Sequence, residues 1–164
     1  MITLLFWNVG AASRPVQISD LATRYDVDVV LLAEVVDEPS ELLLALNKTV
    51  VAYSYAPGIE NTKIHVFARF SETFAAPIYE TDRLTVRRLN PPGIEEILLA
   101  VVHFPSKYAW SDESQSMECT TLANDIRRIE ESAGHHKTVL VGDFNMNPFE
   151  TGVVSAAGMH AVMD

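Results

Sequence analysis

The sequence has a single cysteine, Cys119, so no disulfide can form within the chain. That count is typical of a protein in a reducing compartment. No stretch approaches the ~20 consecutive apolar residues of a membrane-spanning helix. The apolar run at the N-terminus, from Ile2 to Trp7, is not preceded by basic residues and ends at Asn8. It is too short for the hydrophobic region of a secretion signal. We therefore expect a cytoplasmic protein without a membrane span.

Basic residues are also scarce. The chain has 12 Lys and Arg against 22 Asp and Glu, and its formal net charge is −10. This deficit argues against a general nucleic-acid coat, because neutralising phosphate groups needs a surplus of positive charge. It does not exclude a phosphate substrate, because a bound divalent cation reverses the local sign of charge. The sequence has no P-loop and no Gly-x-Gly-x-x-Gly motif.

What the sequence does have is the composition of one globular domain, or part of one: 164 residues, of which 48% are hydrophobic. Apolar runs predict strands and helical spacing predicts helices. Strands are expected at 2–9, 26–35, 50–55, 64–70, 83–89, 94–103 and 139–142, and helices at 13–25, 39–48 and 111–134. The runs 83–89 and 94–103 look like a hairpin, and Pro77 reads as a break between strands. Strands bunched between helices indicate an α+β fold with helices on the outer faces of sheets.

The clearest predicted helix is residues 111–134. Ser111 is a suitable N-cap, and Gly134 is a suitable stop. Its expected buried face is formed by apolar residues at helical spacing, namely Met117, Leu122, Ile126, Ile129 and Ala133.

Polar residues stand abruptly at the ends of four of the apolar strands. Asn8 ends the first, Glu34 the second and His103 the run 94–103, while Asp143 and Asn145 follow Gly142 in "VLVGDFNMNP". A strand end at the rim of a sheet can hold a side chain rigidly while leaving its tip in a cleft. Each residue alone is explained as well by a turn or a cap. Together they form a complementary set, which favours a functional site.

The chemistry of this set points to phosphate-ester hydrolysis. Two carboxylates, Glu34 and Asp143, suit a hard cation such as Mg²⁺, with Mn²⁺ as an alternative. The amides of Asn8 and Asn145 can donate to phosphate oxygens or fix a water molecule. The imidazole of His103 can donate to a phosphate oxygen as charge builds there. A metal-assisted hydrolase of phosphodiesters or phosphomonoesters is the expected class.

Other phosphoryl-transfer motifs and other candidate residues fit less well. A haloacid-dehalogenase-like site needs a second Asp where Asn145 stands, and the Gly-Asn-His motif of calcineurin-like phosphoesterases is absent. Arg87 or Arg88 could contact a phosphate, but a charged residue in a strand is by default expected to face solvent. In the loop after His103, aromatic and basic side chains could contact a substrate base or headgroup, and ordinary loop packing explains them equally; they are Lys107, Tyr108 and Trp110.

Four segments together resemble the endonuclease/exonuclease/phosphatase superfamily, whose fold is DNase I-like. They are "LLFWNV", "DVVLLAEV", "LLAVVHFPSK" and "VLVGDFNMNP", in the family's order and at compatible separations. The resemblance implies a two-layer β-sandwich flanked by helices, with a site at one end of the sandwich. It implies a phosphate-ester substrate, which in this superfamily is a nucleic acid, a nucleotide or a phospholipid headgroup.

The same resemblance implies a role for each site residue. Glu34 would be the principal Mg²⁺ ligand, and Asn8 would help to hold the metal shell and the phosphate. Asp143 would share in the metal site and would orient or deprotonate the attacking water. His103 would contact the scissile phosphate, and Asn145 would hydrogen-bond the phosphate or the nucleophile.

One departure from the family concerns the C-terminal half, which normally adds strands and a late Asp-His pair. His160, in "AAGMHAVMD", lies outside such a context and is expected at a helix end or in a strand. A sandwich of this type needs roughly 200–250 residues. We therefore expect residues 1–164 to be one domain that is incomplete at its C-terminus and, alone, weakly active or inactive. Exposed sheet edges would then favour self-association. The alternative is a catalytically incomplete module that acts in binding or assembly.

Overall fold

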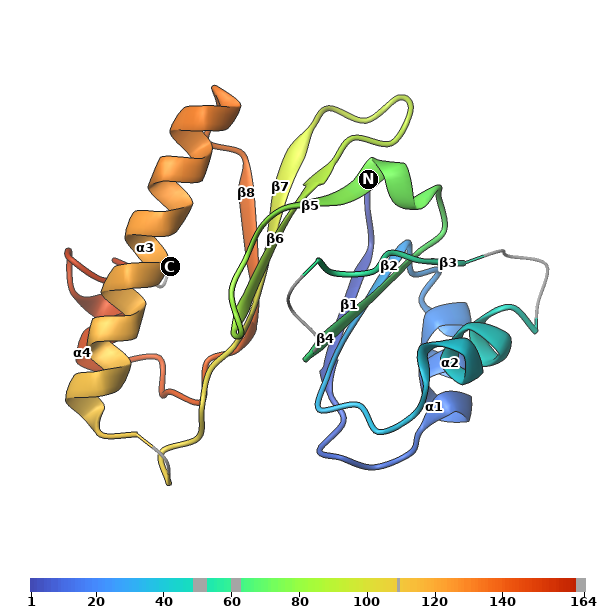
Figure 1. The fold of residues 1–164 in the computed structure, drawn as a ribbon, viewed down its shortest axis with the longest axis horizontal. Coiled ribbons are helices and arrows are strands. Elements are labelled where there is room, and N and C mark those ends of the chain that lie inside the picture. The colour runs from blue at the N-terminus through green and yellow to red at the C-terminus, as the bar shows by residue number, and fades with distance from the viewer. Residues whose placement is uncertain (49–52, 60–62, 109, 162–164) are drawn as a thin grey trace. The chain divides into compact units, whose positions relative to one another are not determined.

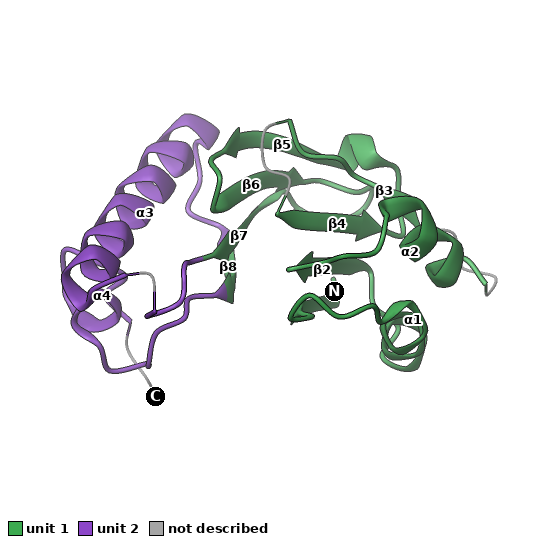
Figure 2. Cartoon of the chain, turned by 60° about the horizontal axis from the view of Figure 1, so that its bottom comes forward, with its two compact units in different colours: residues 1–103, 139–142 green, residues 104–138, 143–164 purple. Residues whose placement is uncertain are grey.

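The computed structural model describes residues 1–48, 53–59, 63–108 and 110–161. The chain forms two compact units, coloured separately in Figure 2. Unit 1 consists of Met1–His103 and Val139–Gly142, and unit 2 consists of Phe104–Thr138 and Asp143–Asp164. None of the helices in the described ranges combines the length and the apolar character needed to cross a membrane.

The described elements include every predicted helix and strand in the predicted order, and β5 and the short helix α4 in addition (Figure 1). They are β1 (Leu4–Asn8), α1 (Pro15–Arg24), β2 (Val29–Ala33), α2 (Pro39–Leu46), β3 (Ser54–Tyr55), β4 (Ile64–Ala68), a 3₁₀ turn η1 (Glu72–Phe74), β5 (Ala75–Glu80), β6 (Leu84–Leu89), β7 (Ile97–His103), α3 (Asp112–Ala133), β8 (Thr138–Asp143) and α4 (Thr151–Val154). Part of the strand predicted at 50–55 lies outside the described residues, and Ser54–Tyr55 is β3.

The first sheet has the strand order β1-β2-β4-β3. Strands β1 and β2 are parallel, and the other pairs are antiparallel. The side chains of β2 are fully buried on both faces, which explains why Val29–Ala33 is a continuous apolar run without alternation. One face packs against α1 and α2, where Ile18 and Leu42 meet Val30 and Leu32.

The second sheet has the order β5-β6-β7-β8, with β5, β6 and β7 antiparallel. A second apolar core joins the two sheets, because Val29 and Leu31 of β2 pack in one cluster with Leu89, Leu99 and Val101 of the second sheet. The predicted α+β sandwich of two sheets with helices is therefore confirmed, and so is the hairpin of β6 and β7.

Strand β5 was not predicted from the sequence. Pro77 lies inside this strand, not at a break between strands. Proline is tolerated there because β5 is an edge strand, and the pairing register with β6 shifts between Pro77 and Tyr79. A proline in the sequence therefore does not always mark the end of a strand.

Helix α3 begins and ends where predicted, and Leu122 and Ile129 are buried as predicted, but the first part of its buried face is different. The Ser111 hydroxyl accepts a hydrogen bond from the backbone N–H of Ser114, and Gly134 adopts a left-handed conformation with φ of 76°. Met117 is 72% exposed, so its predicted place in the core is wrong. The buried face begins at Gln115 and Cys119 instead.

His160 lies in neither a helix nor a strand. It follows a turn after α4, and its backbone N–H donates to the carbonyl of Ser155. The prediction of a regular element at this position is wrong.

The charge of Arg87 is buried, in contrast to the expected solvent-facing strand charge. Its side chain is 1% exposed, and its Nη2 atom lies 3.7 Å from Oε1 of Glu80, whose side chain is 3% exposed. Glu80 also accepts hydrogen bonds from the Thr85 hydroxyl and the backbone N–H of Ile59. Burial lowers the pKa of Arg87 and the Glu80 charge partly restores it. The pair is structural, and Arg87 is not available to a phosphate.

We expect Glu80→Gln to destabilise the fold by about 3–5 kcal/mol, because it leaves the Arg87 guanidinium buried without a counter-charge. The double variant Glu80→Gln/Arg87→Met should recover most of the loss, because it removes the stranded charge. Denaturant unfolding of both variants and the wild type measures the effect. If the free energy of unfolding of Glu80→Gln is within about 0.5 kcal/mol of wild type, the ion pair does not stabilise the fold as proposed.

Candidate active site

The structure confirms that the predicted residues stand at strand ends. Asn8 is the last residue of β1, His103 the last of β7 and Asp143 the last of β8, while Glu34 directly follows β2. Asn8, Glu34 and His103 belong to unit 1, whereas Asp143 and Asn145 belong to unit 2.

In unit 1, the side chains of Asn8 and His103 converge on one carboxylate oxygen. The Oε1 atom of Glu34 accepts a hydrogen bond from Nδ2 of Asn8 at 3.1 Å. The Nε2 atom of His103 also lies 3.1 Å from Oε1, and it donates in the tautomer that carries the hydrogen on Nε2. The His103 side chain is 15% exposed and that of Glu34 is 41% exposed. The mostly buried imidazole of His103 therefore fixes the orientation of the Glu34 carboxylate, which remains exposed to solvent.

The backbone of Glu34 is held in an unfavourable conformation. Its φ of 53° lies in the left-handed region, which few residues other than glycine and asparagine adopt. The loop after β1 fixes it there, because the N–H of Ala11 donates to the Glu34 carbonyl at 2.9 Å. The N–H of Gly10 donates to Oδ1 of Asn8 at 3.0 Å. Strain that the surroundings maintain in this way is characteristic of functional sites.

In unit 2, the residues after β8 form a tight polar loop. Oδ1 of Asp143 accepts from the N–H of Asn145 at 2.9 Å, which is an Asx-type turn. Asn145 is also left-handed, with φ of 50°. Its Nδ2 atom donates to the carbonyl of Phe104 at 2.8 Å, and the Phe104 N–H donates to the Asp143 carbonyl. The loop is thereby attached to the residue that follows His103 in the chain.

Gly142 precedes this loop because a side chain has no room there. A Cβ at this position would lie 2.0 Å from the backbone oxygen of Val102 in β7. This approach of two backbones explains the glycine of the Gly-Asp-Phe-Asn motif in physical terms.

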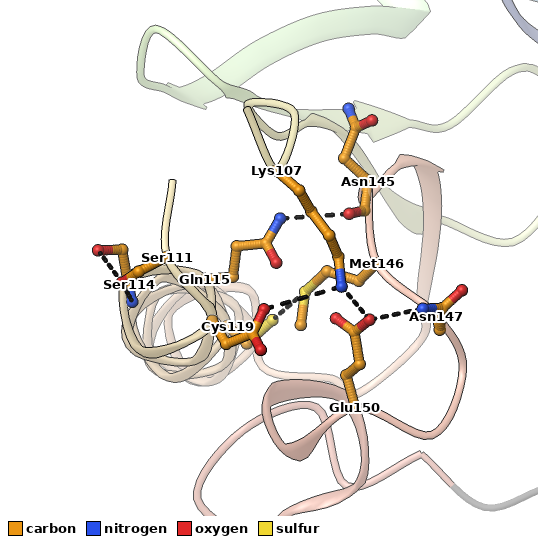
Figure 3. A network of polar contacts seen from close by, with 10 residues as sticks. Lys107, Ser111, Ser114, Gln115, Cys119, Asn145, Met146, Asn147 and Glu150 are labelled. Carbon is orange, nitrogen blue, oxygen red and sulfur yellow. Dashed lines mark hydrogen bonds and ion pairs between the residues drawn. The ribbon is translucent and has the colours of Figure 1, made fainter. Parts of the chain in front are cut away.

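A cleft of ≈ 490 Å³ lies beside the same loop in unit 2. Its lining residues come from the start of α3 and from the segment 146–152, and they include Phe149, which is 73% exposed. Lys107, a candidate for substrate contact, forms ion pairs with Glu150 and Asp112 (Figure 3). The hydrogen bond to Glu150 raises the pKa of Lys107. Lys107 therefore joins the loop after His103 to the segment that follows Asn145.

A divalent cation fits the donors of this site. In the described ranges, no group of three or more His, Cys, Asp or Glu side chains is arranged to hold a metal by itself. Mg²⁺ does not need one, because it is usually bound by one or two carboxylates together with water and substrate phosphates. The exposed and oriented carboxylate of Glu34 has the required oxygen chemistry.

Gln115 was not predicted from the sequence as a residue of the site. Its side chain is fully buried on α3, and its Nε2 atom donates to the backbone carbonyl of Asn145 at 3.2 Å. The available signal was a polar residue one helical turn before Cys119, on the side of the helix that is buried.

Two face-packed sheets and acid, amide and imidazole groups at strand ends define a DNase I-like protein. The sequence profile described as the Endonuclease/Exonuclease/phosphatase family matches residues 5–158, and the chain belongs to this family. No curated protein matches the sequence.

Solved structures of very different sequence share the fold. The catalytic domain of human Nocturnin with a bound sulfate anion is 18% identical with a TM-score of 0.63, over 95% of this chain and 70% of that one. Truncated TDP2 from Caenorhabditis elegans is 16% identical with a TM-score of 0.61, over 91% and 64%. A mannosyl-6-phosphatase from Bacteroides thetaiotaomicron is 13% identical with a TM-score of 0.66, over 94% and 69%. The chain thus spans about two thirds of the length of these structures.

Proposed function

We propose that the protein is a divalent-metal-dependent hydrolase of phosphate esters that acts in the cytoplasm. The observation that carries the proposal is the Glu34 carboxylate, which is exposed, backbone-strained and held at Oε1 by Asn8 and His103. Such an arrangement has a cost in stability and no evident benefit to folding. Membership of the Endonuclease/Exonuclease/phosphatase family supports the same class of reaction.

Two of the structural neighbours bear on the substrate. The Nocturnin structure holds a sulfate anion, which has the shape and charge of a phosphate group, and the Bacteroides protein is a phosphatase. They support a phosphate ester as substrate. We propose a nucleic acid, a nucleotide or a phospholipid headgroup as its source.

We propose that Glu34, Asp143 and Asn8 hold Mg²⁺ or Mn²⁺. When bound, the cation supplies positive charge that stabilises the developing negative charge on the phosphate. Asn8 also keeps Glu34 in place through Nδ2, while its Oδ1 atom accepts a hydrogen bond from the N–H of Gly10.

The remaining steps belong to side chains of the protein. His103 would donate a hydrogen bond from Nε2 to a phosphate oxygen, a role in which the substrate replaces Glu34 as acceptor. Asp143 would orient the attacking water and accept its proton, because the Asx turn fixes its carboxylate. Asn145 would hydrogen-bond the phosphate or the nucleophile.

The alternative function is a binding or assembly module. It is favoured by the strand orders, in which β1 and β8 are edge strands among the described strands. Unpaired backbone groups at such edges can pair with another chain, so self-association is part of this proposal. Sedimentation velocity measured over a range of protein concentrations tests it.

Metal removal tests the proposed activity. We expect the full-length protein to hydrolyse bis-p-nitrophenyl phosphate or p-nitrophenyl phosphate, the first reporting a diesterase and the second a monoesterase. Chelation with EDTA should abolish the activity, and Mg²⁺ or Mn²⁺ should restore it. The same assay on oligonucleotides, nucleotides and phospholipids then identifies the substrate class. Activity that survives chelation would contradict the metal requirement, and no hydrolysis of any substrate would favour the binding module.

A further inference from the structure

We propose that Gln115 is a positioning residue that holds the Asp143–Asn145 loop in its reactive conformation. The inference rests on the proposed function for its effect on catalysis, but its structural part is independent. Gln115 lies on α3, thirty positions before Asn145, and Figure 3 shows its side chain directed at the backbone of that residue.

The contact involves the part of the loop that most needs support. Asn145 has the left-handed φ of 50°, and the Nε2 atom of Gln115 donates to its carbonyl oxygen at 3.2 Å. The N–H of Asn145 donates to Asp143, and its Nδ2 atom donates to the carbonyl of Phe104. The N–H, the carbonyl and the side-chain amide of Asn145 are therefore all hydrogen-bonded, and Gln115 supplies the one contact that comes from a helix.

The burial of Gln115 has no explanation in packing. Its side chain is 0% exposed, and its Oε1 atom has no hydrogen-bond partner among the described residues. A buried polar atom without a partner is costly, and methionine would fill the same volume without that cost. The position therefore needs the N–H donor rather than the bulk of the side chain.

Loss of this donor should affect catalysis through geometry. Without it the Asn145 carbonyl loses its hydrogen-bond donor, and the left-handed turn loses one of its supports. The Asp143 carboxylate is oriented by the Asn145 N–H, so it would lose its fixed direction. An effect on the orientation of a base lowers kcat more than it raises KM, because substrate binding does not depend on that orientation.

The test compares Gln115→Met with wild type and with Leu122→Ala. Leu122 lies on the buried face of the same helix and is 3% exposed, so its truncation reports simple loss of packing. We expect Gln115→Met to lower kcat by about 10–100-fold, the usual effect of removing a group that orients a site residue. KM should change by less than about threefold. Amide hydrogen exchange at Asn145, measured by NMR, should become about tenfold faster or more.

Each result decides the proposal. Leu122→Ala should lower the melting temperature while leaving kcat and the local exchange at Asn145 near wild type. Unchanged kcat or unchanged Asn145 exchange in folded Gln115→Met would overturn the positioning role. If Gln115→Met does not fold, Gln115→Leu carries the same test. If the wild type hydrolyses nothing, the proposed function fails, whereas the exchange at Asn145 still shows whether Gln115 holds the loop.

Discussion

Glu34→Gln is expected to reduce metal-dependent hydrolysis by about 10³-fold or more in kcat/KM. The substitution keeps the size of the side chain and an oxygen that can accept from Asn8 and His103, but it removes the negative charge. A cation at such a site contributes several kcal/mol of charge stabilisation, and each 1.36 kcal/mol is a factor of ten in rate. The change should also weaken Mn²⁺ binding measured by calorimetry.

A matched control for this variant is Glu41→Gln. Glu41 lies in the first turn of α2 and is exposed, so its neutralisation changes the net charge by the same amount without touching the site. We expect its kcat/KM to stay within about twofold of wild type, as for most surface substitutions. Full activity of Glu34→Gln would remove this carboxylate from the proposed ligand set.

Asp143→Asn should lower kcat by about 10²–10⁴-fold, the range expected when a general base is lost. Asparagine keeps an Oδ1 atom that can accept from the N–H of Asn145, so the Asx turn and the loop should be retained. Metal binding should persist in part through Glu34, which separates this variant from Glu34→Gln. Mn²⁺ calorimetry and kcat, measured on the same preparation, report both effects.

The control for the second variant is Asp20→Asn, an exposed position on α1. It should leave kcat near wild type. A kcat for Asp143→Asn equal to that of wild type would refute its role with the attacking water. Complete loss of Mn²⁺ binding in Asp143→Asn would instead show that Asp143 is the dominant ligand.

Much of the fold could be predicted from the sequence, because its core strands are long apolar runs with abrupt ends. The run from Val29 to Ala33 is buried on both faces, and its composition shows this directly. Strand β5 could not be predicted, because Ala75–Glu80 is an edge strand that contains a proline and a register shift. Arg87 was misjudged because its counter-charge, Glu80, lies on a neighbouring strand that the sequence did not reveal.

The candidate site could be predicted in its residue types but not in its connections. The parallel pairing of β1 and β2 brings Asn8 and Glu34 to the same end of a sheet, which sequence reasoning anticipated from the strand ends. The bonds from Asn8 and His103 to a single carboxylate oxygen depend on side-chain geometry. The contact of Gln115 depends on which face of α3 is buried. The spacing of apolar residues predicted that this face includes Met117, which is exposed, and gave no place on it to Gln115.

The central claim is that the carboxylates of Glu34 and Asp143 serve one divalent ion. The most direct measurement is a crystal structure of the protein with Mn²⁺, located by its anomalous scattering. We expect one ion with oxygens of Glu34 and Asp143 in its coordination shell, at about the 2.1 Å typical of Mg²⁺ sites. Mn²⁺ bound elsewhere, or the two carboxylates at positions that no single ion can reach, would contradict it.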